Sequence, residues 1–288
     1  MGEVRFLHLA VGRINIDVTV RLDSLPAEGE NANTDVFEIS IGGAAANYSM
    51  AVAALGHSAS LIAKVSKDEL IKVLMRALAE KGVILDHVIE VEGPQSSALI
   101  LLRKGGKISI VRRTGVSSLL SPSDYRYLVP LFDVVHYASV PPQLVLPKDS
   151  QRLVTYDPGP YASEAVVETK VDVLFCNEIE FSKIGERTEA RSIVVKMGER
   201  GAKVVSGGIE CVANSYPVEE VIDTTGAGDV FDATFNSFLV SGADIKEALA
   251  AAVVASGLKV TRLGTSNPPT YGELMSAMAK GKVKVECK

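Results

Sequence analysis

The stretch Asp223-Thr224-Thr225-Gly226-Ala227-Gly228-Asp229 combines two carboxylates, two hydroxyls and two glycines. An apolar run over 230–240 follows it, with aromatic residues recurring at helical spacing. The pattern predicts a glycine-rich turn that opens a helix, so the N–H groups of Gly226, Ala227, Gly228 and Asp229 lack partners within the helix. Free N–H donors at the positive end of a helix dipole bind anions, and glycine lets the anion approach closely.

Asp229 stands among these donors, although a carboxylate repels a bound anion. Its position makes chemical sense if it takes the proton from a hydroxyl that attacks a phosphate. The alternative is a plain turn with an N-capping Asp, and the turn alone does not separate the two interpretations.

The segment 223–231 resembles the C-terminal signature of the PfkB carbohydrate kinases, the ribokinase-like superfamily that phosphorylates sugars and nucleosides. Three other segments match motifs of that family in the family's order. They are Gly12-Arg13-Ile14-Asn15-Ile16-Asp17, Gly42-Gly43-Ala44-Ala45-Ala46-Asn47 and Asn177-Glu178-Ile179-Glu180. The resemblance covers nearly the whole chain, and in motif detail it is nearest to archaeal sugar and nucleoside kinases.

The order of predicted strands and helices favours an α/β fold with a mostly parallel sheet. Apolar runs typical of buried strands occur at 5–11, 60–65, 134–138, 152–156, 171–175 and 192–196. The resemblance implies a ribokinase-like three-layer αβα domain over 1–288. Four segments alternate apolar and polar residues instead, at 14–21, 34–40, 98–103 and 107–112, the last two joined by Gly105-Gly106. We expect them to form a small sheet over about 13–40 and 96–113. In the family such a sheet is a lid over the substrate; the alternative is surface hairpins without a role.

The residue pattern and the resemblance agree on Asp229 as the catalytic base, with the turn 226–229 as the anion hole for the γ-phosphate. The resemblance assigns four residues of the N-terminal half to the acceptor's hydroxyls. These are Asp17, Gly42, Gly43 and Asn47. A carboxylate and an amide suit this role because they accept hydrogen bonds from vicinal hydroxyls.

The resemblance places the nucleotide in the C-terminal half. Its predicted contacts are Asn177, Lys196, Gly198, Gly201, Thr224 and Asn267. Glu180 is the predicted Mg²⁺ ligand, because Mg²⁺ prefers oxygen ligands and travels with ATP. A helix capped by Asn177, with Glu180 in its first turn, would give the same pattern. In many family members the loop 261–268 and the carbonyls of 223–225 bind a monovalent cation such as K⁺; the sequence leaves this open.

Composition limits the partners. The net charge of −5 and the pI near 5.5 argue against a nucleic-acid or anionic-membrane partner, since both would call for a basic patch. No apolar run reaches the length of a membrane span. The three cysteines, Cys176, Cys211 and Cys287, are far apart and predict neither a disulfide nor a zinc site. We expect a cytoplasmic protein with a small-molecule substrate.

The leading functional hypothesis is an ATP- and Mg²⁺-dependent kinase of a sugar or of a nucleoside's ribose. The alternative is a non-catalytic ligand sensor on a kinase fold. Ribokinases proper carry a Lys after the two N-terminal glycines, where this chain has Ala44. They also carry a Glu after the central strand, where this chain has the sequence His136-Tyr137-Ala138-Ser139-Val140-Pro141. Both differences count against D-ribose as the substrate.

The lid strands also predict an oligomer. Ile100, Leu102, Ile108 and Ile110 alternate along the hairpin, beside Val18 and Val20. We expect this apolar face to be exposed and to pair two lids in a homodimer.

Overall fold

The structure is a computed structural model that describes all residues except 1–3, 104, 106, 149, 165–169 and 185–187. Its main sheet has the strand order β16-β15-β14-β13-β12-β11-β10-β1-β4-β6. Seven neighbouring strands of this sheet, β13-β12-β11-β10-β1-β4-β6, run parallel to one another. The remaining three strands, β14, β15 and β16, are antiparallel to their neighbours and form one edge of the sheet. Their bounds are β1 Leu7–Val11, β4 Ser58–Ile62, β6 Val83–Ile84, β10 Val134–Ala138, β11 Leu153–Asp157, β12 Val173–Asn177, β13 Ser192–Lys196, β14 Ala202–Ser206, β15 Ile209–Ala213 and β16 Val285–Cys287. The predicted mostly parallel sheet is confirmed.

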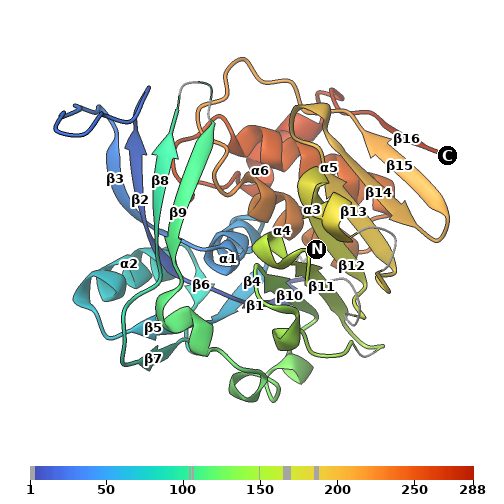
Figure 1. The fold of residues 1–288 in the computed structure, drawn as a ribbon. Coiled ribbons are helices and arrows are strands. Elements are labelled where there is room, and N and C mark those ends of the chain that lie inside the picture. The colour runs from blue at the N-terminus through green and yellow to red at the C-terminus, as the bar shows by residue number, and fades with distance from the viewer. Residues whose placement is uncertain (1–3, 104, 106, 149, 165–169, 185–187) are drawn as a thin grey trace.

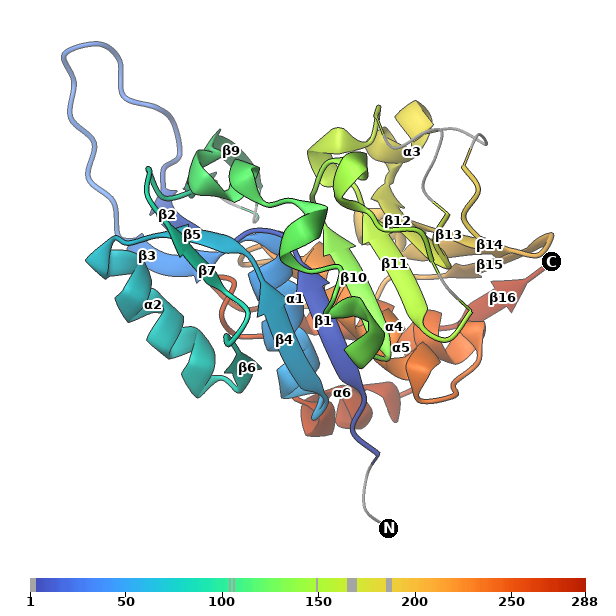
Figure 2. The same ribbon diagram turned by 90° about the horizontal axis from the view of Figure 1, so that it is seen from below.

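Helices cover both faces of this sheet (Figures 1 and 2). One face carries α1 (Ala44–Ala54), α4 (Ala227–Val240), α5 (Ile245–Lys259) and α6 (Tyr271–Met278). In the described part of the chain, the other face is covered by α3 (Glu178–Ile184) and by short 3₁₀ turns, including Gly115–Leu119, Pro122–Asp124 and Gly159–Tyr161. A further helix, α2 (Glu69–Glu80), lies near the β6 edge, capped by Asp68. No helix within the described residues combines the length and the apolar character needed to span a bilayer.

The predicted small sheet is present. Its strand order is β3-β2-β8-β9, with β2 and β8 parallel and the outer pairs antiparallel. The bounds are β2 Asn15–Arg21, β3 Phe37–Gly42, β8 Ser97–Leu102 and β9 Ile108–Arg113. Of the predicted Gly105-Gly106 turn, Gly106 lies outside the described residues. A second small sheet, β5 (Lys64–Ser66) with β7 (Ile89–Val91), was not predicted. We call the four-stranded sheet the lid.

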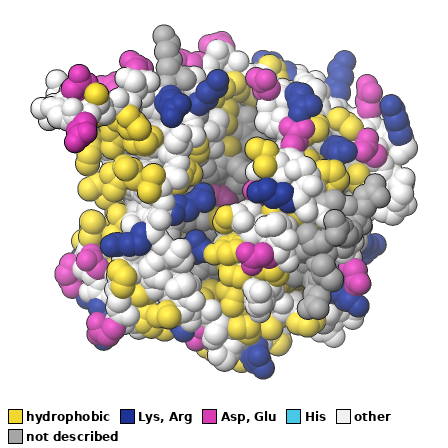
Figure 3. All heavy atoms as spheres, viewed as in Figure 1, with side chains coloured by type: hydrophobic (Ala, Val, Ile, Leu, Met, Phe, Trp, Pro, Cys, Tyr) yellow, Lys and Arg dark blue, Asp and Glu magenta, His cyan; other side chains and the backbone are white. Residues whose placement is uncertain are grey.

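The prediction of which lid face is exposed was wrong. Ile100 and Leu102 are only 2% and 1% exposed, and Ile100 pairs with Ile110 on the inner face. The outer face carries a different apolar set, namely Phe37, Ile39, Leu99 and Val111, exposed by 67%, 47%, 39% and 63%. Hydrophobic side chains gather at that side of the molecule in Figure 3. Both rows of the hairpin are apolar, so their alternation does not reveal which row faces inward.

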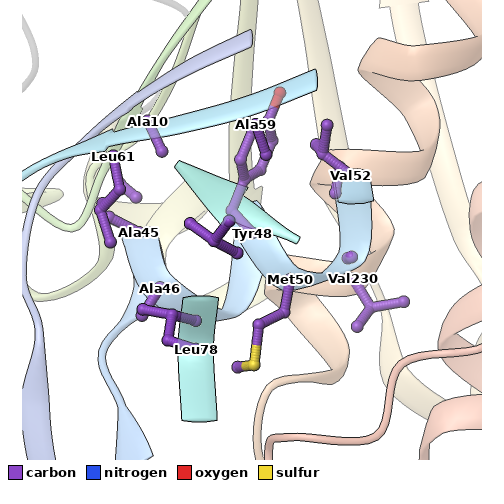
Figure 4. Packing of buried hydrophobic residues seen from close by; sticks show 14 of the residues in the cluster. Ala10, Ala45, Ala46, Tyr48, Met50, Val52, Ala59, Leu61, Leu78 and Val230 are labelled. Carbon is purple, nitrogen blue, oxygen red and sulfur yellow. The ribbon is translucent and has the colours of Figure 1, made fainter. Parts of the chain in front are cut away.

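Helix α1 is fixed by a core of small side chains and one large ring (Figure 4). Ala45 and Ala46 are fully buried and let the helix lie close to the sheet. Tyr48 is also fully buried; its hydroxyl lies 3.0 Å from His8 Nδ1 and accepts a hydrogen bond from Asn236 Nδ2 on α4. Because α1 is anchored on both sides, Asn47 on its first turn is held in one place.

The expectation that no disulfide forms was also wrong. Cys211 on β15 is bonded to Cys287 on β16, across antiparallel strands that place the two residues opposite each other. They are 76 residues apart in sequence, so only the pairing of the edge strands brings them together. Cys176 is a free thiol buried in the core.

Candidate active site

A hollow of about 200 Å³ lies between the lid and the carboxyl ends of the central strands. Figure 3 shows Lys and Arg side chains around a central hollow, with acidic side chains deeper inside. Six of the predicted site residues line it: Asp17, Gly43, Asn47, Thr224, Gly226 and Asp229. Gly42 is directly adjacent, because a Cβ on it would lie 1.8 Å from Asp17 Oδ2. Segments from both halves of the chain therefore converge on one site.

The predicted glycine turn opens α4. Gly226 is the N-cap residue and has φ = 76°, a left-handed conformation that favours glycine. The N–H of Ala227 donates to the carbonyl of Thr224, and the N–H of Val230 donates to that of Gly226. The anion donors of the first turn are therefore the N–H groups of Gly228 and Asp229, rather than the full predicted set.

Asp229 is held by a residue from the other half of the chain. Asn47 Nδ2 donates to Asp229 Oδ2 over 2.7 Å. Burial raises the pKa of Asp229 to about 7, against the lowering effects of this hydrogen bond and of the Lys196 ammonium. The carboxyl group therefore titrates near neutral pH, where a general base is most effective.

In the hollow, two buried acceptor atoms lack partners within the described chain. They are Oδ1 of Asp17 and Oδ1 of Asn47, both on residues that line the hollow. Asp17 is 4% exposed, and burial raises its pKa to about 7. A buried acceptor without a partner is costly, so these atoms fit a ligand that brings hydroxyl donors. Gly43, with φ = 100°, caps α1 directly beside them.

Lys196 lies behind the anion turn, where its Nζ would be 3.4 Å from a Cβ on Gly228. The ammonium bonds to Asp157 Oδ2 over 2.6 Å and to Asp232 Oδ1 over 2.9 Å. Burial opposes charge on Lys196, but the two carboxylates outweigh it and raise its pKa. Lys196 is therefore a permanent positive charge beneath the turn, embedded in an ion cluster.

Asn177 and Glu180 cap α3 reciprocally. Asn177 Oδ1 accepts from the N–H of Glu180 over 2.9 Å, and Glu180 Oε2 accepts from the N–H of Asn177 over 2.8 Å. The cap uses one carboxylate oxygen of Glu180 and does not involve Oε1. No set of three or more His, Cys, Asp or Glu among the described residues forms a metal cage. One carboxylate at a strand end fits a Mg²⁺ that arrives with its nucleotide and keeps most of its waters.

The other predicted nucleotide contacts lie outside the hollow. Gly198 and Gly201 flank the 3₁₀ turn Gly198–Arg200 after β13, and Asn267 is exposed, with its carbonyl accepting from Arg262 Nη1 over 3.4 Å. Only Thr224 of the nucleotide set lines the hollow itself.

A buried lysine lies beside the loop predicted to bind a monovalent cation. Lys259 is fully buried at the end of α5, and its Nζ donates to the carbonyl of Arg262 over 3.3 Å. Asp223 is 1% exposed and accepts hydrogen bonds from Thr225 N, Thr225 Oγ1 and Gly264 N. Burial lowers the pKa of Lys259, and Asp223 is the main charge that opposes this effect. A protein ammonium therefore lies next to the predicted cation loop.

Among the lining residues that sequence reasoning missed are the polar side chains of Arg13, Arg112 and Ser139. Arg13 follows β1, and Arg112 lies on β9 of the lid. Ser139 follows β10 with φ = 52°, which is uncommon for a residue other than glycine and often occurs at functional sites. Arginines in polar turns and lid strands look like solvated surface residues, so no sequence signal distinguished them.

The family model described as "pfkB family carbohydrate kinase" matches residues 7–270. The chain belongs to the PfkB family. It is therefore a phosphotransferase with a hydroxyl acceptor, related to sugar and nucleoside kinases. The ATP-dependent ribose-1-phosphate kinase of Halopiger xanaduensis is 30% identical over 280 residues, which covers 91% of this chain and 94% of the relative. The ribokinase of Bacillus subtilis is 27% identical, covering 92% and 96%.

Solved PfkB-type structures share the fold. The nucleoside kinase of Methanocaldococcus jannaschii superposes with a TM-score of 0.81 at 20% identity, covering 97% of this chain and all of that one. The ribokinase of Arabidopsis thaliana, complexed with ribose and ATP, gives a TM-score of 0.78 at 24% identity, covering 96% and 99%. The predicted ribokinase-like fold is confirmed.

Proposed function

We propose that this PfkB protein transfers the γ-phosphate of ATP to a hydroxyl of a sugar or of a nucleoside's ribose, with Asp229 as base. The observation that carries the proposal is the placement of Asp229. It lies beside the anion donors of α4, is bonded to Asn47, and shares a hollow with the unpartnered acceptor atoms of Asp17 and Asn47.

In the proposed reaction the acceptor hydroxyl oxygen forms a bond to the γ-phosphorus. The bond between that phosphorus and the β–γ bridging oxygen breaks, and ADP leaves with that electron pair. Asp229 takes the hydroxyl proton, a contribution worth roughly 10²–10⁴-fold in rate. The N–H groups of Gly228 and Asp229 stabilise charge on the transferred group, and Lys196 adds a fixed positive charge behind them.

Mg²⁺ is part of the proposal, with Glu180 as its protein ligand through the oxygen that the α3 cap does not use. Bound with ATP, the metal would neutralise phosphate charge. The nucleotide would approach over the ends of β12 and β13, where ligands collect in open α/β sheets.

The comparisons leave the acceptor open, since the relatives carry the names of ribokinases, deoxyribokinases, a 6-phosphofructokinase and a ribose-1-phosphate kinase. The hollow is smaller than the roughly 300–1,000 Å³ of drug-sized sites, which favours an acceptor near the size of one sugar. A non-catalytic sensor remains the alternative, but a sensor would not need a base with its pKa near neutrality.

The test is an ADP-release assay with ATP, Mg²⁺ and a panel of sugars, sugar phosphates and nucleosides. With at least one acceptor, we expect the enzyme to release one ADP for each acceptor molecule phosphorylated. Mass spectrometry identifies and quantifies the phosphorylated product. Acceptor binding by calorimetry without turnover across the panel would instead establish the sensor.

We also propose that the protein is a homodimer through the outer face of the lid. Ile39, Val18, Leu99 and Val111 form one cross-strand row on that face, and an exposed apolar row of this kind is uncommon on a monomer. A two-fold pairing of identical lids would cover the same row on both copies.

A further inference from the structure

Two arginines define the acceptor side of the hollow. Arg13 lies in the turn between β1 and β2, and Arg112 lies on the lid strand β9; both line the hollow together with Asp17 and Asp229. Within the described chain, neither guanidinium forms an ion pair with a carboxylate, whereas Arg21, Arg200 and Arg262 all do. Two guanidinium groups therefore line the ligand site without a direct ion pair to any described carboxylate.

The lid register places Arg112 close to Asp17. Asp17 pairs with Ala98, and Ala98 pairs with Arg112, so the three lie in one row across the inner face. Two strand spacings, about 10 Å, separate the backbones of Asp17 and Arg112. The small side chain of Ala98 between them leaves room for the guanidinium to reach across the row.

The electrostatics agree with this geometry. After burial, Arg112 is the strongest influence on the pKa of Asp17, whereas on Asp229 it is weaker than Asn47, Lys196 and Asp157. Arg112 therefore acts mainly on Asp17, on the acceptor side of the hollow, whereas Lys196 acts more strongly on Asp229, on the phosphoryl-transfer side.

Arg13 is preoriented without losing its charge. Its Nη2 donates to the hydroxyl of Tyr161, and its guanidinium lies 5.5 Å from the centre of the Tyr161 ring. A neutral phenol fixes the direction of the guanidinium and leaves its remaining donors for a ligand.

From this arrangement we infer that the acceptor itself carries a phosphate group, held by Arg13 and Arg112, so the product is a sugar with two phosphates. Guanidinium groups match phosphate geometry, with paired N–H donors at fixed spacing. Neighbouring hydroxyls of the acceptor would donate to Asp17 and Asn47, the reacting hydroxyl would face Asp229, and the phosphate that the acceptor already carries would lie against Arg13 and Arg112. This inference rests on the proposed kinase activity.

The experiment compares kcat/KM for matched pairs of acceptors: ribose against ribose 1-phosphate and ribose 5-phosphate, fructose against fructose 6-phosphate, and adenosine against AMP. We expect the best phosphorylated acceptor to exceed its phosphate-free partner by at least roughly 100-fold, as two charge-assisted contacts would provide. Arg112→Met should lose roughly 10- to 100-fold in kcat/KM for it, mainly through KM, with the KM for ATP unchanged. Arg103→Met, on the same lid but outside the hollow, serves as the control.

The outcomes separate the two proposals. The inference would be overturned if the enzyme preferred a phosphate-free sugar or nucleoside to every phosphorylated acceptor and if Arg112→Met left kcat/KM for that acceptor unchanged. The kinase proposal would then stay intact. ADP release from no acceptor at all would overturn the kinase proposal and the inference with it. Binding of the phosphorylated sugars, followed by calorimetry, provides a readout that does not depend on turnover.

A second, independent observation concerns Lys259. Its ammonium is fully buried and bonds to the carbonyl of Arg262 in the turn that follows α5. The N–H of Asp223 donates to the carbonyl of Val260, the residue directly after Lys259, over 3.1 Å. We propose that this ammonium takes the place of a monovalent cation and stiffens the turn 223–226, so that catalysis needs no added K⁺. Lys259 is a positioning residue, because it acts through Asp223 and the hydrogen bonds of Asp223 to Thr225 and Gly264.

The test compares wild type and Lys259→Ala in sodium- and potassium-free buffer, with KCl or tetramethylammonium chloride at equal ionic strength. Wild-type kcat and melting temperature should not respond specifically to K⁺. The variant should melt lower and lose activity, and KCl should restore part of both. A wild-type kcat that rises more than about fivefold with K⁺ alone, or a variant that matches wild type without K⁺, would refute this role.

Discussion

The amide of Asn47 donates a 2.7 Å hydrogen bond to the carboxylate of Asp229, across a sequence separation of 182 residues. The bond joins the N-terminal half of the chain, whose Asn47 is a proposed acceptor contact, to the C-terminal half, whose Asp229 is the proposed base. In the proposed reaction Asn47 would couple acceptor binding to proton transfer, since it also presents a buried, unpartnered Oδ1.

Removing the base should abolish most of the turnover. Asp229→Asn keeps the size of the side chain and should lower kcat by about 10²-fold or more at saturating acceptor, because no group is left to take the proton. ATP binding, measured by calorimetry, should be retained. Near wild-type kcat in this variant would remove Asp229 from the mechanism.

The Asn47 bond should control the pH profile. Asp229 has a pKa of about 7 and works as a base only when ionised, so activity should rise as pH increases through that value. Asn47 stabilises the ionised form, so Asn47→Ala should move the acidic limb to higher pH and also raise the KM for the acceptor. The measurement is kcat/KM from pH 5 to 9; an unmoved limb would contradict the coupling.

The same pKa predicts a stability cost. The folded pKa of Asp229 is above its unfolded value, so the folded state binds the proton more tightly and this contribution to stability is lost as pH rises from about 4 through about 7. Without ligand, Asp229→Asn should therefore melt at a higher temperature than wild type at pH 8 and at a similar temperature near pH 4. Thermal melts at both pH values measure the difference. A lower melting temperature for the variant at pH 8 would contradict the expected burial of charge.

Glu180 should set the requirement for metal. Glu180→Gln keeps an oxygen for the α3 cap but loses the charge, so the Mg²⁺ concentration for half-maximal activity should rise several-fold. Glu178→Gln, which removes a neighbouring surface ion pair with Arg200, is the matched control. Equal Mg²⁺ titrations for the two variants would place the metal elsewhere.

Light scattering tests the lid dimer. We expect a mass about twice the 30.6 kDa of the monomer, and Val111→Lys on the outer lid face should lower it. Ile209→Lys, at an exposed position of β15 away from the lid, should leave the mass unchanged. A monomer mass for wild type at micromolar concentration would exclude the dimer.

The sequence predicted those features that short-range chemistry encodes. The turn 226–229 was found because glycines, a carboxylate and an amphipathic run occur together within one window. The Asn47–Asp229 bond and the Cys211–Cys287 disulfide were not found, because only the packed fold brings such distant residues together. Arg112 was missed because alternation along a strand shows two faces but not which one lies over a ligand.

The disulfide makes a covalent ring of the chain from Cys211 to Cys287. The ring contains the turn 226–229 with the proposed base Asp229, together with α4, α5 and α6. A single protease cut in an exposed connection inside it, such as the one between α4 and α5, would leave both fragments tethered. Such a nicked protein would migrate as one species on a denaturing gel and separate into two only after a thiol is added.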